Sequence, residues 1–299
     1  MVFSPAKLNL GLRIVGRRPD GYHLLQSLFW PLTFVDTLQV ESAQQVQVQY
    51  LWASDAPIPH PVLLQNSETL LGKMLETLVS EKKIPPLKVS IQKRIPIGGG
   101  LGGVSSNCGT VLKYCMDQKW LSSAEAHQVA SRFGADIPFF ISATPSWVTG
   151  IGEKISPLTL QFQPGQKLFF LLLLFPFQIP TPLIFKKYRD AQIGMSSESD
   201  WDPRRNQDWN SFLNYLENCQ NDLEAIVVKE RSEIQKALNS LRLTDCITSQ
   251  ISGTGATCYG IYASEEKRLK AAQEIETICR DLNCRKLFTE TFTSCAVQL

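Results

Sequence analysis

A glycine-dense stretch at residues 96–107 has the composition of a loop that binds phosphate. It reads Pro-Ile-Gly-Gly-Gly-Leu-Gly-Gly-Val-Ser-Ser-Asn and lies between an alternating strand pattern and an apolar helix pattern. Glycines carry no Cβ, so successive backbone N–H groups can point into one concavity, and the N-terminus of the following helix adds about half a positive charge. The stretch therefore predicts an anion-binding turn, with phosphate as the natural ligand.

Two common nucleotide-binding loops fit this stretch poorly. Gly98, Gly100 and Gly103 have the spacing G-x-G-x-x-G, but a dinucleotide-binding unit requires a second parallel strand after the helix, and here another helix pattern follows. Val104 and Ser105 stand where a Walker A loop has lysine and then serine or threonine. The chain also has no H-R-D or D-F-G motif of protein kinases. From these residues alone, the stretch could also be a structural glycine turn that binds no ligand.

The length and the net charge of the chain indicate which kinds of molecule it binds. The chain has 299 residues, of which 43% are hydrophobic, enough for one large or two moderate cores. Its 30 basic and 28 acidic residues nearly cancel, which disfavours a nucleic-acid platform or a polybasic membrane anchor. The apolar run at 168–175 ends at Pro176, well short of the roughly 20 residues of a membrane helix, and predicts a central buried strand. We therefore expect small-molecule ligands, with no nucleic acid and no membrane as partner.

The eight cysteines and three histidines show no metal-binding spacing, and no C-x-x-C pair occurs. A chain of this length does not depend on disulfides for its core, so we expect reduced thiols packed as small hydrophobic side chains. The first motif begins at Ser4 with no signal sequence before it. This start predicts a cytoplasmic, bacterial protein.

The patterns around these residues predict an α+β protein. Strict alternation over 7–14 predicts a half-buried strand that carries Lys7 and Asn9 on one face. Ser122 with Glu125 predicts a capping box at the start of a helix. Other strand patterns fall at 24–34, 37–41, 46–52, 87–94, 256–263 and 286–292, and helix patterns at 67–83, 104–120, 123–133, 209–218, 220–229, 231–241 and 265–282.

The chain divides most naturally at a turn-rich segment near its middle. Proline and glycine in residues 154–166 predict a boundary between an N-terminal domain over 1–155 and a C-terminal domain over 156–299. Within the second domain, the polar stretch 195–208 is poor in apolar residues and is expected to be a mobile excursion.

Several separated motifs together resemble the GHMP family of small-molecule kinases. The P-x-D-G-Y-H element is similar to the branch whose acceptor is a methylerythritol linked to cytidine diphosphate. The resemblance implies a two-lobe α+β fold, with an N-terminal lobe like ribosomal protein S5, a ferredoxin-like C-terminal lobe, and the active site in the cleft between them. The matching segments are 4–10 (S-P-A-K-L-N-L), 18–23 (R-P-D-G-Y-H), 96–107, 134–140 (G-A-D-I-P-F-F), 179–182, 221–223 and 252–255.

The resemblance implies a role for each matching side chain in ATP-dependent phosphorylation of an alcohol. Asp136 would be the general base that accepts the proton of the substrate hydroxyl, and Lys7 beside it would keep it ionised. Without the resemblance, Asp136 could be a helix N-cap and Lys7 a solvated strand lysine. Mg²⁺ would arrive with ATP, through Ser105 or Ser106 and without a dedicated metal site. The implied ATP-binding residues are Pro96, Ile97, Gly98, Gly99, Gly100, Leu101, Gly102, Gly103, Val104, Ser105 and Ser106.

The resemblance also implies a substrate-binding set. Tyr22 and His23 would stack on and read a cytosine ring, with Phe185 closing its other face. Residues outside this aromatic group complete the set: Asn9, Lys93 and Thr181. Taken alone, a histidine in a turn or a lysine at a strand end is more often structural. Two alternatives remain for the whole chain, namely another small-alcohol kinase of the mevalonate or homoserine type, and a non-catalytic nucleotide-binding protein.

Two features depart from the family's usual loop. Val104 replaces a glycine, and its backbone is expected to be helical or extended because valine does not tolerate a positive φ. Cys108 and Gly109 replace a pair of small residues, and a glycine inside a helix should cost about 1 kcal/mol relative to alanine.

Overall fold

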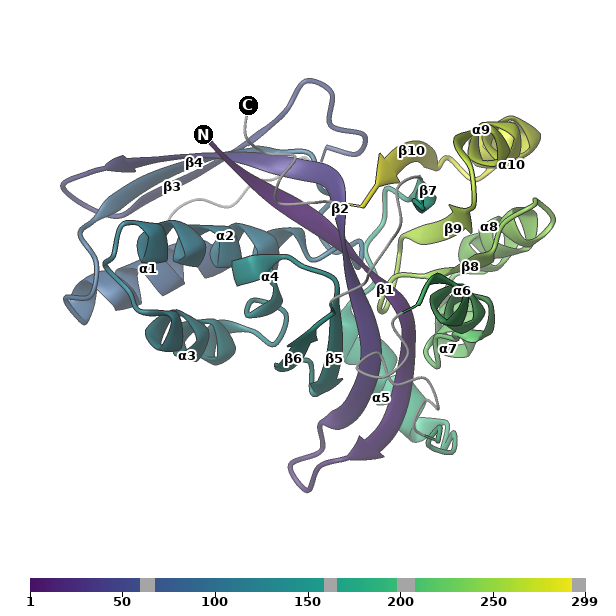
Figure 1. Cartoon of the computed structure of the whole chain (residues 1–299), viewed down its shortest axis with the longest axis horizontal. Coiled ribbons are helices and arrows are strands. Elements are labelled where there is room, and N and C mark those ends of the chain that lie inside the picture. Colours follow the sequence, from purple (N-terminus) through teal and green to yellow (C-terminus); the bar gives the residue numbers. More distant parts are fainter. Residues whose placement is uncertain (60–67, 159–165, 198–207, 292–299) are drawn as a thin grey trace.

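The computed structural model describes residues 1–59, 68–158, 166–197 and 208–291. Its strands form two separate sheets, and the helices of each half of the chain gather on that half (Figure 1). The predicted two-lobe α+β fold is confirmed. The strands of the first sheet end at Pro157 and those of the second begin at Phe169, on either side of residues 159–165, which lie outside the described ranges. The polar stretch 195–208 also falls mostly outside them.

The N-terminal half builds a six-stranded sheet with the order β3-β4-β2-β5-β6, in which β1 pairs with β2. Only the β3–β4 pair is parallel among these described strands. The helices α1 to α3 pack on this sheet around a buried apolar core. The elements are β1 (Val2–Arg17), β2 (His23–Ser42), β3 (Gln47–Trp52), β4 (Leu87–Lys93), β5 (Ser146–Gly150) and β6 (Lys154–Pro157), with α1 (Leu70–Ser80), α2 (Gly103–Asp117), α3 (Ser123–Phe133) and α4 (Phe139–Ser142).

The second strand is longer than the sequence patterns suggest. The expected segments 24–34 and 37–41 are one continuous strand, β2, which pairs with β1 along one edge and with β5 and then β4 along the other. Pro31 lies inside this strand, opposite Lys7 and beside the register shift between Pro5 and Lys7. A proline is tolerated there because the hydrogen-bond ladder is already interrupted.

The C-terminal half forms a four-stranded antiparallel sheet with the order β10-β7-β9-β8. β7 lies inside this sheet and is almost fully buried, which confirms the central strand predicted from the apolar run. The expected helix 265–282 is two helices that meet at the buried Ile275. The elements are β7 (Phe169–Leu174), β8 (Thr248–Ile251), β9 (Cys258–Tyr262) and β10 (Arg285–Glu290), with α5 (Thr181–Asp190), α6 (Trp209–Asn218), α7 (Glu224–Glu230), α8 (Ser232–Arg242), α9 (Glu265–Glu274) and α10 (Glu276–Asp281).

The strand β1 contacts both halves of the chain (Figure 1). The Leu12 N–H donates to the Gln220 carbonyl at 2.8 Å, and the Tyr259 hydroxyl donates to the Asn9 carbonyl at 2.8 Å. Gly11 between them has φ +77°, and a Cβ there would lie 3.0 Å from Cys219 Cβ. The residue must therefore be glycine for the C-terminal half to approach so closely. This contact fixes the strand that carries Lys7 and Asn9 relative to both sheets.

Helix ends and helix contacts follow local rules that the sequence only partly reveals. The capping box of Ser122 and Glu125 forms as predicted. Val104 lies in the first turn of α2 with helical backbone, as expected. The structure explains why a glycine is present at position 109, which the sequence did not show. A Cβ there would lie 2.5 Å from Phe140 Cβ. The absence of a side chain lets α4 pack directly against α2, so the low helix propensity of glycine is offset by close packing.

Candidate active site

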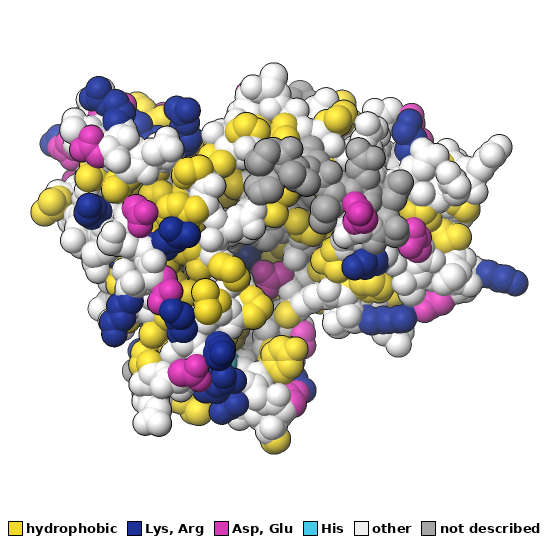
Figure 2. All heavy atoms as spheres, turned by 180° about the vertical axis from the view of Figure 1, so that it is seen from behind, with side chains coloured by type: hydrophobic (Ala, Val, Ile, Leu, Met, Phe, Trp, Pro, Cys, Tyr) yellow, Lys and Arg dark blue, Asp and Glu magenta, His cyan; other side chains and the backbone are white. Residues whose placement is uncertain are grey.

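A cavity of about 770 Å³ opens between the two halves of the chain. Seen from behind the view of Figure 1, the surface is hollowed there, with apolar side chains around the hollow and Lys and Arg side chains gathered below it (Figure 2). The cavity wall combines residues of β1 and β2, the glycine loop, the segment before α4, one face of α5 along its whole length and the 253–254 turn. Most of the residues predicted for catalysis and binding line this one cavity.

Lys7 and Asp136 face each other in this cavity. Lys7 Nζ lies 3.6 Å from Asp136 Oδ2 and 4.6 Å from the centre of the Phe29 ring. Lys7 is 4% exposed, whereas the Asp136 side chain is 35% exposed and open to the cavity. Burial lowers the pKa of Lys7, and the negative charge of the nearby Asp136 offsets this only in part. The helix α4 starts after Pro138 without a side-chain cap, so Asp136 is not its N-cap.

The glycine loop folds into a tight turn braced from the C-terminal half. Gly98, Gly100 and Gly102 have φ values of +71°, +77° and +70°. A Cβ at Gly100 would lie 2.2 Å from the Ser252 carbonyl oxygen, and the Ser252 hydroxyl donates to the Gly100 carbonyl at 2.8 Å. The Thr257 N–H donates to the Gly99 carbonyl at 3.1 Å. The second glycine turn at 252–255 therefore supports the first one.

The helix α2 begins where this loop ends. Its first residues, Gly103, Val104 and Ser105, line the cavity, and the first turn carries no acidic side chain. The N–H groups of a first turn have no partner within their own helix and sit at its positive end. Because Lys7 donates its backbone N–H to the Leu101 carbonyl at 3.0 Å, the same loop is joined to the strand that carries the lysine. An anionic group bound at this helix end would therefore lie beside Lys7 and Asp136.

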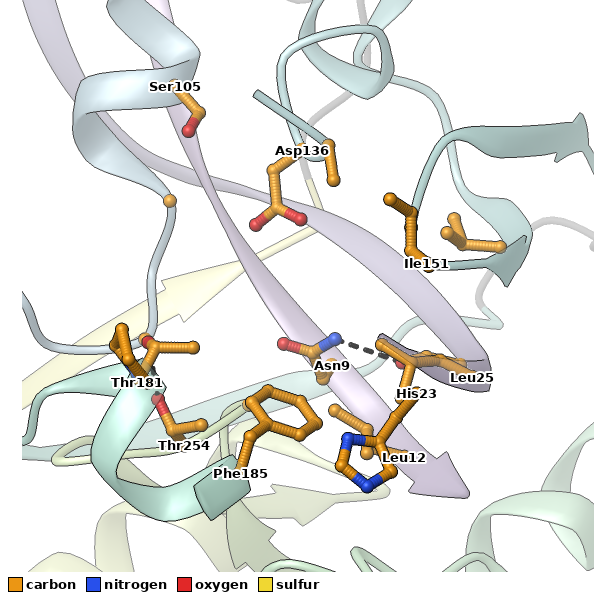
Figure 3. A pocket seen from close by; sticks show the side chains of 18 of the residues that line it. Asn9, Leu12, His23, Leu25, Ser105, Asp136, Ile151, Thr181, Phe185 and Thr254 are labelled. Atoms are coloured by element: carbon orange, nitrogen blue, oxygen red, sulfur yellow. Dashed lines mark hydrogen bonds between the residues drawn. The ribbon is translucent and has the colours of Figure 1, made fainter. Parts of the chain in front are cut away.

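Two of the predicted loop residues point away from the cavity. Leu101 is buried in the apolar core between the two sheets. Ser106 is also buried, and its hydroxyl accepts a hydrogen bond from Ser4 at 2.7 Å. Ser105 remains on the cavity wall, and its hydroxyl lies on the same side of the cavity as Asp136 (Figure 3). Of the two serines, only Ser105 is placed to contact a bound phosphate.

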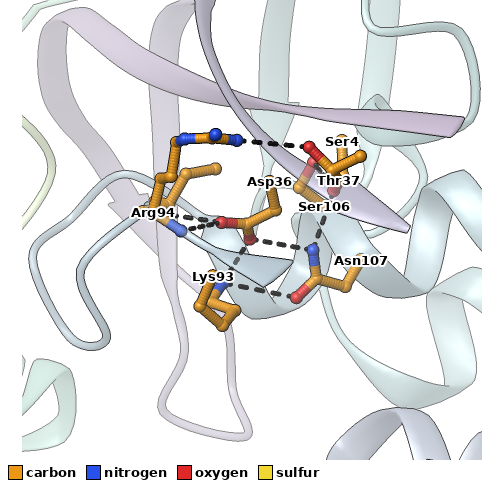
Figure 4. Close-up of polar contacts among 8 residues, drawn as sticks. Ser4, Asp36, Thr37, Lys93, Arg94, Ser106 and Asn107 are labelled. Atoms are coloured by element: carbon orange, nitrogen blue, oxygen red, sulfur yellow. Dashed lines mark hydrogen bonds and ion pairs between the residues drawn. The ribbon is translucent and has the colours of Figure 1, made fainter. Parts of the chain in front are cut away.

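Lys93 was expected to contact substrate phosphates, but the structure does not bring it to the cavity. Lys93 is fully buried and forms an ion pair with Asp36, which is also fully buried (Figure 4). Asp36 accepts further hydrogen bonds from the N–H groups of Arg94 and Ile95 and from the Asn107 amide, at 2.8, 2.9 and 3.0 Å. Asp36 falls in the gap between the strand patterns 24–34 and 37–41, so the sequence did not reveal it as the partner of this lysine. Lys93 therefore packs beneath Gly103 at the end of the glycine loop, inside the protein, and does not face a ligand.

The aromatic residues predicted for base recognition lie at the other end of the cavity. The His23 and Phe185 rings stack directly, with centres 5.4 Å apart and planes at 26° (Figure 3). Tyr22 is 61% exposed on the cavity rim. Burial, followed by the charges of Arg17 and Arg189, lowers the pKa of His23 and so favours its neutral form at pH 7. Phe185 thus contacts His23 itself, whereas most of the Tyr22 side chain is exposed.

Three cavity residues, Arg17, Lys186 and Arg189, were not singled out from the sequence, and they bring basic charge to the aromatic end. Thr254, in the matching segment 252–255, hydrogen-bonds to the predicted Thr181 at 3.0 Å. The spacing of four residues between Phe185 and Arg189 in a helix pattern could have indicated that they share a face. Ser27 was missed because a serine in an apolar strand carries no distinctive signal.

The described ranges contain no group of three or more His, Cys, Asp or Glu side chains placed to hold a metal ion. Within the same ranges, no helix is both long enough and apolar enough to cross a membrane.

Comparison with known proteins identifies the class of this fold and site. The model of the GHMP kinase N-terminal domain matches residues 69–144, and that of the GHMP kinase C-terminal domain matches residues 204–281. Together the two matches span more than half of the chain. The chain therefore belongs to the GHMP kinase family, a family of small-molecule kinases that use ATP.

Solved structures of this family share the fold over nearly the whole chain. A 4-(cytidine 5′-diphospho)-2C-methyl-D-erythritol kinase is 24% identical, covers 97% of this chain and 99% of its own, and superposes with a TM-score of 0.72. The mevalonate kinase of Methanococcus jannaschii is 13% identical, with 98% of both chains covered and a TM-score of 0.63. The homoserine kinase of Cytophaga hutchinsonii is 12% identical, covers 98% of this chain and 94% of its own, and has a TM-score of 0.57.

Proposed function

We propose that this protein transfers the γ-phosphoryl group of ATP to the 2-hydroxyl of 4-diphosphocytidyl-2-C-methyl-D-erythritol, yielding the 2-phosphate and ADP. The reaction would serve the non-mevalonate route to isoprenoid precursors in a bacterial cytoplasm. One observation carries the kinase chemistry: Lys7 and Asp136 lie 3.6 Å apart in the cavity that the N-terminus of α2 enters. A base for an alcohol and an anion site for a triphosphate thus share one enclosed space.

The residues present fit a bound ATP. The five glycines of the loop, at 98, 99, 100, 102 and 103, have no side chains to exclude the phosphates, and the first turn of α2 lines the cavity where the phosphates would bind. ATP supplies the electrophilic γ-phosphorus, and the Ser105 hydroxyl with the nucleotide's own phosphates would hold Mg²⁺. No carboxylate cage is required, because Mg²⁺ commonly binds through substrate phosphates and few protein ligands.

The transfer needs one proton acceptor and close control of charge. Asp136 would take the proton of the substrate hydroxyl as that oxygen bonds to the γ-phosphorus, while the bond to the β–γ bridging oxygen breaks and its electron pair leaves with ADP. Lys7 would keep the carboxylate ionised and attract the developing alkoxide. Because 35% of the Asp136 side chain is exposed, it can reach a substrate without breaking a closed network.

The opposite end of the cavity supports the choice of acceptor. His23, Phe185 and Tyr22 offer ring faces and polar edges suited to a pyrimidine base. Arg17 and Arg189 bring positive charge to the same end, where a diphosphate would lie. Mevalonate and homoserine carry neither a nucleobase nor a diphosphate. The aromatic and basic side chains at this end of the cavity would therefore have no partner on either acceptor.

An assay of ADP release with three acceptors tests the proposal. We expect rapid turnover with the cytidyl substrate and turnover at least about a hundredfold slower with mevalonate or homoserine, because the aromatic and basic end would bind only the first. Preference for mevalonate or homoserine would assign the protein to another small-alcohol kinase. ATP binding with background turnover on all three acceptors would indicate a non-catalytic homologue.

A further inference from the structure

A buried chain of hydrogen bonds connects the catalytic lysine to the second strand of the sheet. Lys7 Nζ donates to Asn9 Oδ1 at 2.5 Å, and Asn9 Nδ2 donates to Ser27 Oγ at 3.0 Å. The Ser27 hydroxyl in turn donates to the Gly11 carbonyl oxygen at 2.6 Å. Asn9 is 2% and Ser27 1% exposed, so bulk water scarcely competes with these bonds. The dashed line from the Asn9 amide nitrogen in Figure 3 is the middle bond of this chain.

The direction of every bond in this chain is determined by chemistry. A carbonyl oxygen can only accept, so the single hydroxyl hydrogen of Ser27 is committed to Gly11. Toward Asn9, Ser27 can therefore act only as an acceptor, and the asparagine must present its NH₂ group to it. The carboxamide oxygen then faces Lys7, whose ammonium can only donate. Ser27 thus selects which end of the asparagine amide meets the lysine.

The Gly11 carbonyl is available because β1 is irregular at this point. Leu10 pairs with Leu28 and Leu12 pairs with Ser27, so Gly11 is an extra residue at a register shift. Its carbonyl accepts the Ser27 hydroxyl where a regular strand would use it in the ladder. From the C-terminal half, a Cβ at Gly253 would lie 3.1 Å from Asn9 Oδ1, so this turn closes over the amide. The arrangement leaves Asn9 little freedom to move.

We propose that Ser27 is a positioning residue for phosphoryl transfer, acting through Asn9 to hold Lys7 as an ammonium beside Asp136. The inference rests on the proposed function, because it assigns Lys7 its role there. Without the Ser27 acceptor, the Asn9 amide is released and can turn its NH₂ group toward the ammonium. Lys7 would then lose an acceptor in a buried site, and its charged form would be disfavoured.

The test compares Ser27→Ala with Ser27→Thr, which retains a hydroxyl able to donate and accept. For Ser27→Ala we expect kcat to fall about tenfold, the effect of one lost hydrogen bond in a buried site. The KM for ATP should stay near that of the unmodified protein, because the glycine loop is untouched. The alkaline limb of the kcat profile should move to lower pH as the pKa of Lys7 falls. Ser27→Thr should restore both kcat and the profile.

A buried serine elsewhere provides the matched control. Ser249 in β8 is 6% exposed, and its hydroxyl has no hydrogen-bond partner among the residues that the structure describes. Ser249→Ala removes the same atom from the C-terminal sheet and should change neither kcat nor the pH profile. An unchanged kcat and alkaline limb in Ser27→Ala would overturn the proposal, as would equal losses in the alanine and threonine variants. If Ser27→Ala does not fold, Ser27→Cys, with its weakly bonding thiol, is measured against the same expectations.

A readout that needs no acceptor separates this inference from the proposed function. The pKa of Lys7 can be followed by NMR of ¹⁵N-labelled lysine side chains in the ATP-free protein, with Lys7→Arg identifying its signal. We expect this pKa to be lower in Ser27→Ala than in the unmodified protein and in Ser27→Thr. A protein that showed this shift but ignored the cytidyl substrate would refute the assigned reaction alone. A protein that phosphorylated the cytidyl substrate but showed no pKa shift of Lys7 in Ser27→Ala would refute only the role of Ser27.

Discussion

Two lysine–aspartate pairs, a closed one of Lys93 with Asp36 and an open one of Lys7 with Asp136, show how burial and hydrogen bonding distinguish a structural ion pair from one that can act on a substrate. Asp36 is fully buried and accepts bonds from Lys93, two backbone N–H groups and the Asn107 amide. Asp136 lies 3.6 Å from Lys7, and about a third of its side chain is exposed in the cavity. A carboxylate whose acceptor sites are filled cannot take a proton from a substrate. One that is held by a single lysine remains able to do so.

The largest expected effect is on turnover at the open pair. Asp136→Asn should reduce kcat by about 10²–10⁴-fold, because the amide cannot accept the hydroxyl proton. ATP affinity, measured by calorimetry, should be essentially unchanged. Asp117→Asn is the control, since that carboxylate pairs with Lys113 on the exposed face of α2. Turnover of Asp136→Asn within tenfold of the unmodified protein would remove the distinction between the two pairs.

The closed pair should instead respond in stability. Asp36→Ala leaves the Lys93 charge and two N–H groups buried without their acceptor, and should lower the free energy of unfolding by about 3–5 kcal/mol. The control is Asp55→Ala, which removes the exposed partner of Arg94 and should cost less than about 1 kcal/mol. Denaturant unfolding measures both. Equal losses in the two variants would argue against the buried network as a support of the fold.

Gly103 contacts the closed pair and also lines the cavity of the open pair, so a substitution there tests whether the closed pair positions the glycine loop. It lines the cavity, and a Cβ there would lie 2.8 Å from Ile95 Cγ2 and 3.1 Å from Lys93 Nζ. Gly103→Ala should therefore displace the first turn of α2, at a cost of about 1–3 kcal/mol, and raise the KM for ATP about tenfold. Gly194→Ala is the control, because among the described residues no atom beyond the two chain neighbours lies within 4 Å of a Cβ at that position. An unaltered KM would show that the closed pair does not position the loop.

The smallest effect concerns the pH dependence of the open pair. Burial lowers the pKa of Lys7, so its ammonium is lost, and kcat should fall, at a lower pH than for an ordinary lysine. Lys7→Arg keeps the charge at every accessible pH. We expect a modest loss of kcat in this variant together with disappearance of the alkaline limb. Persistence of that limb would assign it to a group other than Lys7.

Local sequence patterns predicted most of the elements but few of the contacts between them. The helix expected at 209–218 is α6, and the capping box at Ser122 starts α3 as expected. The patterns split β2 into the segments 24–34 and 37–41 and treated 265–282 as one helix. Each error falls where a residue's role depends on a distant partner. A buried aspartate cannot be distinguished from a strand end until the lysine that neutralises it is known.

The amino-acid sequence by itself determined the glycine turn, the alternation that sets Lys7 and Asn9 on one face, and, through its motifs, the family. Only the tertiary structure decided that Lys7 meets Asp136, that Lys93 is withdrawn into a closed network, and that Ser27 orients Asn9. Turns and alternation depend on neighbours along the chain, where φ, ψ and the pleat are set locally. The charge state and freedom of a side chain depend on atoms brought close by packing, and those atoms lie far away in the sequence.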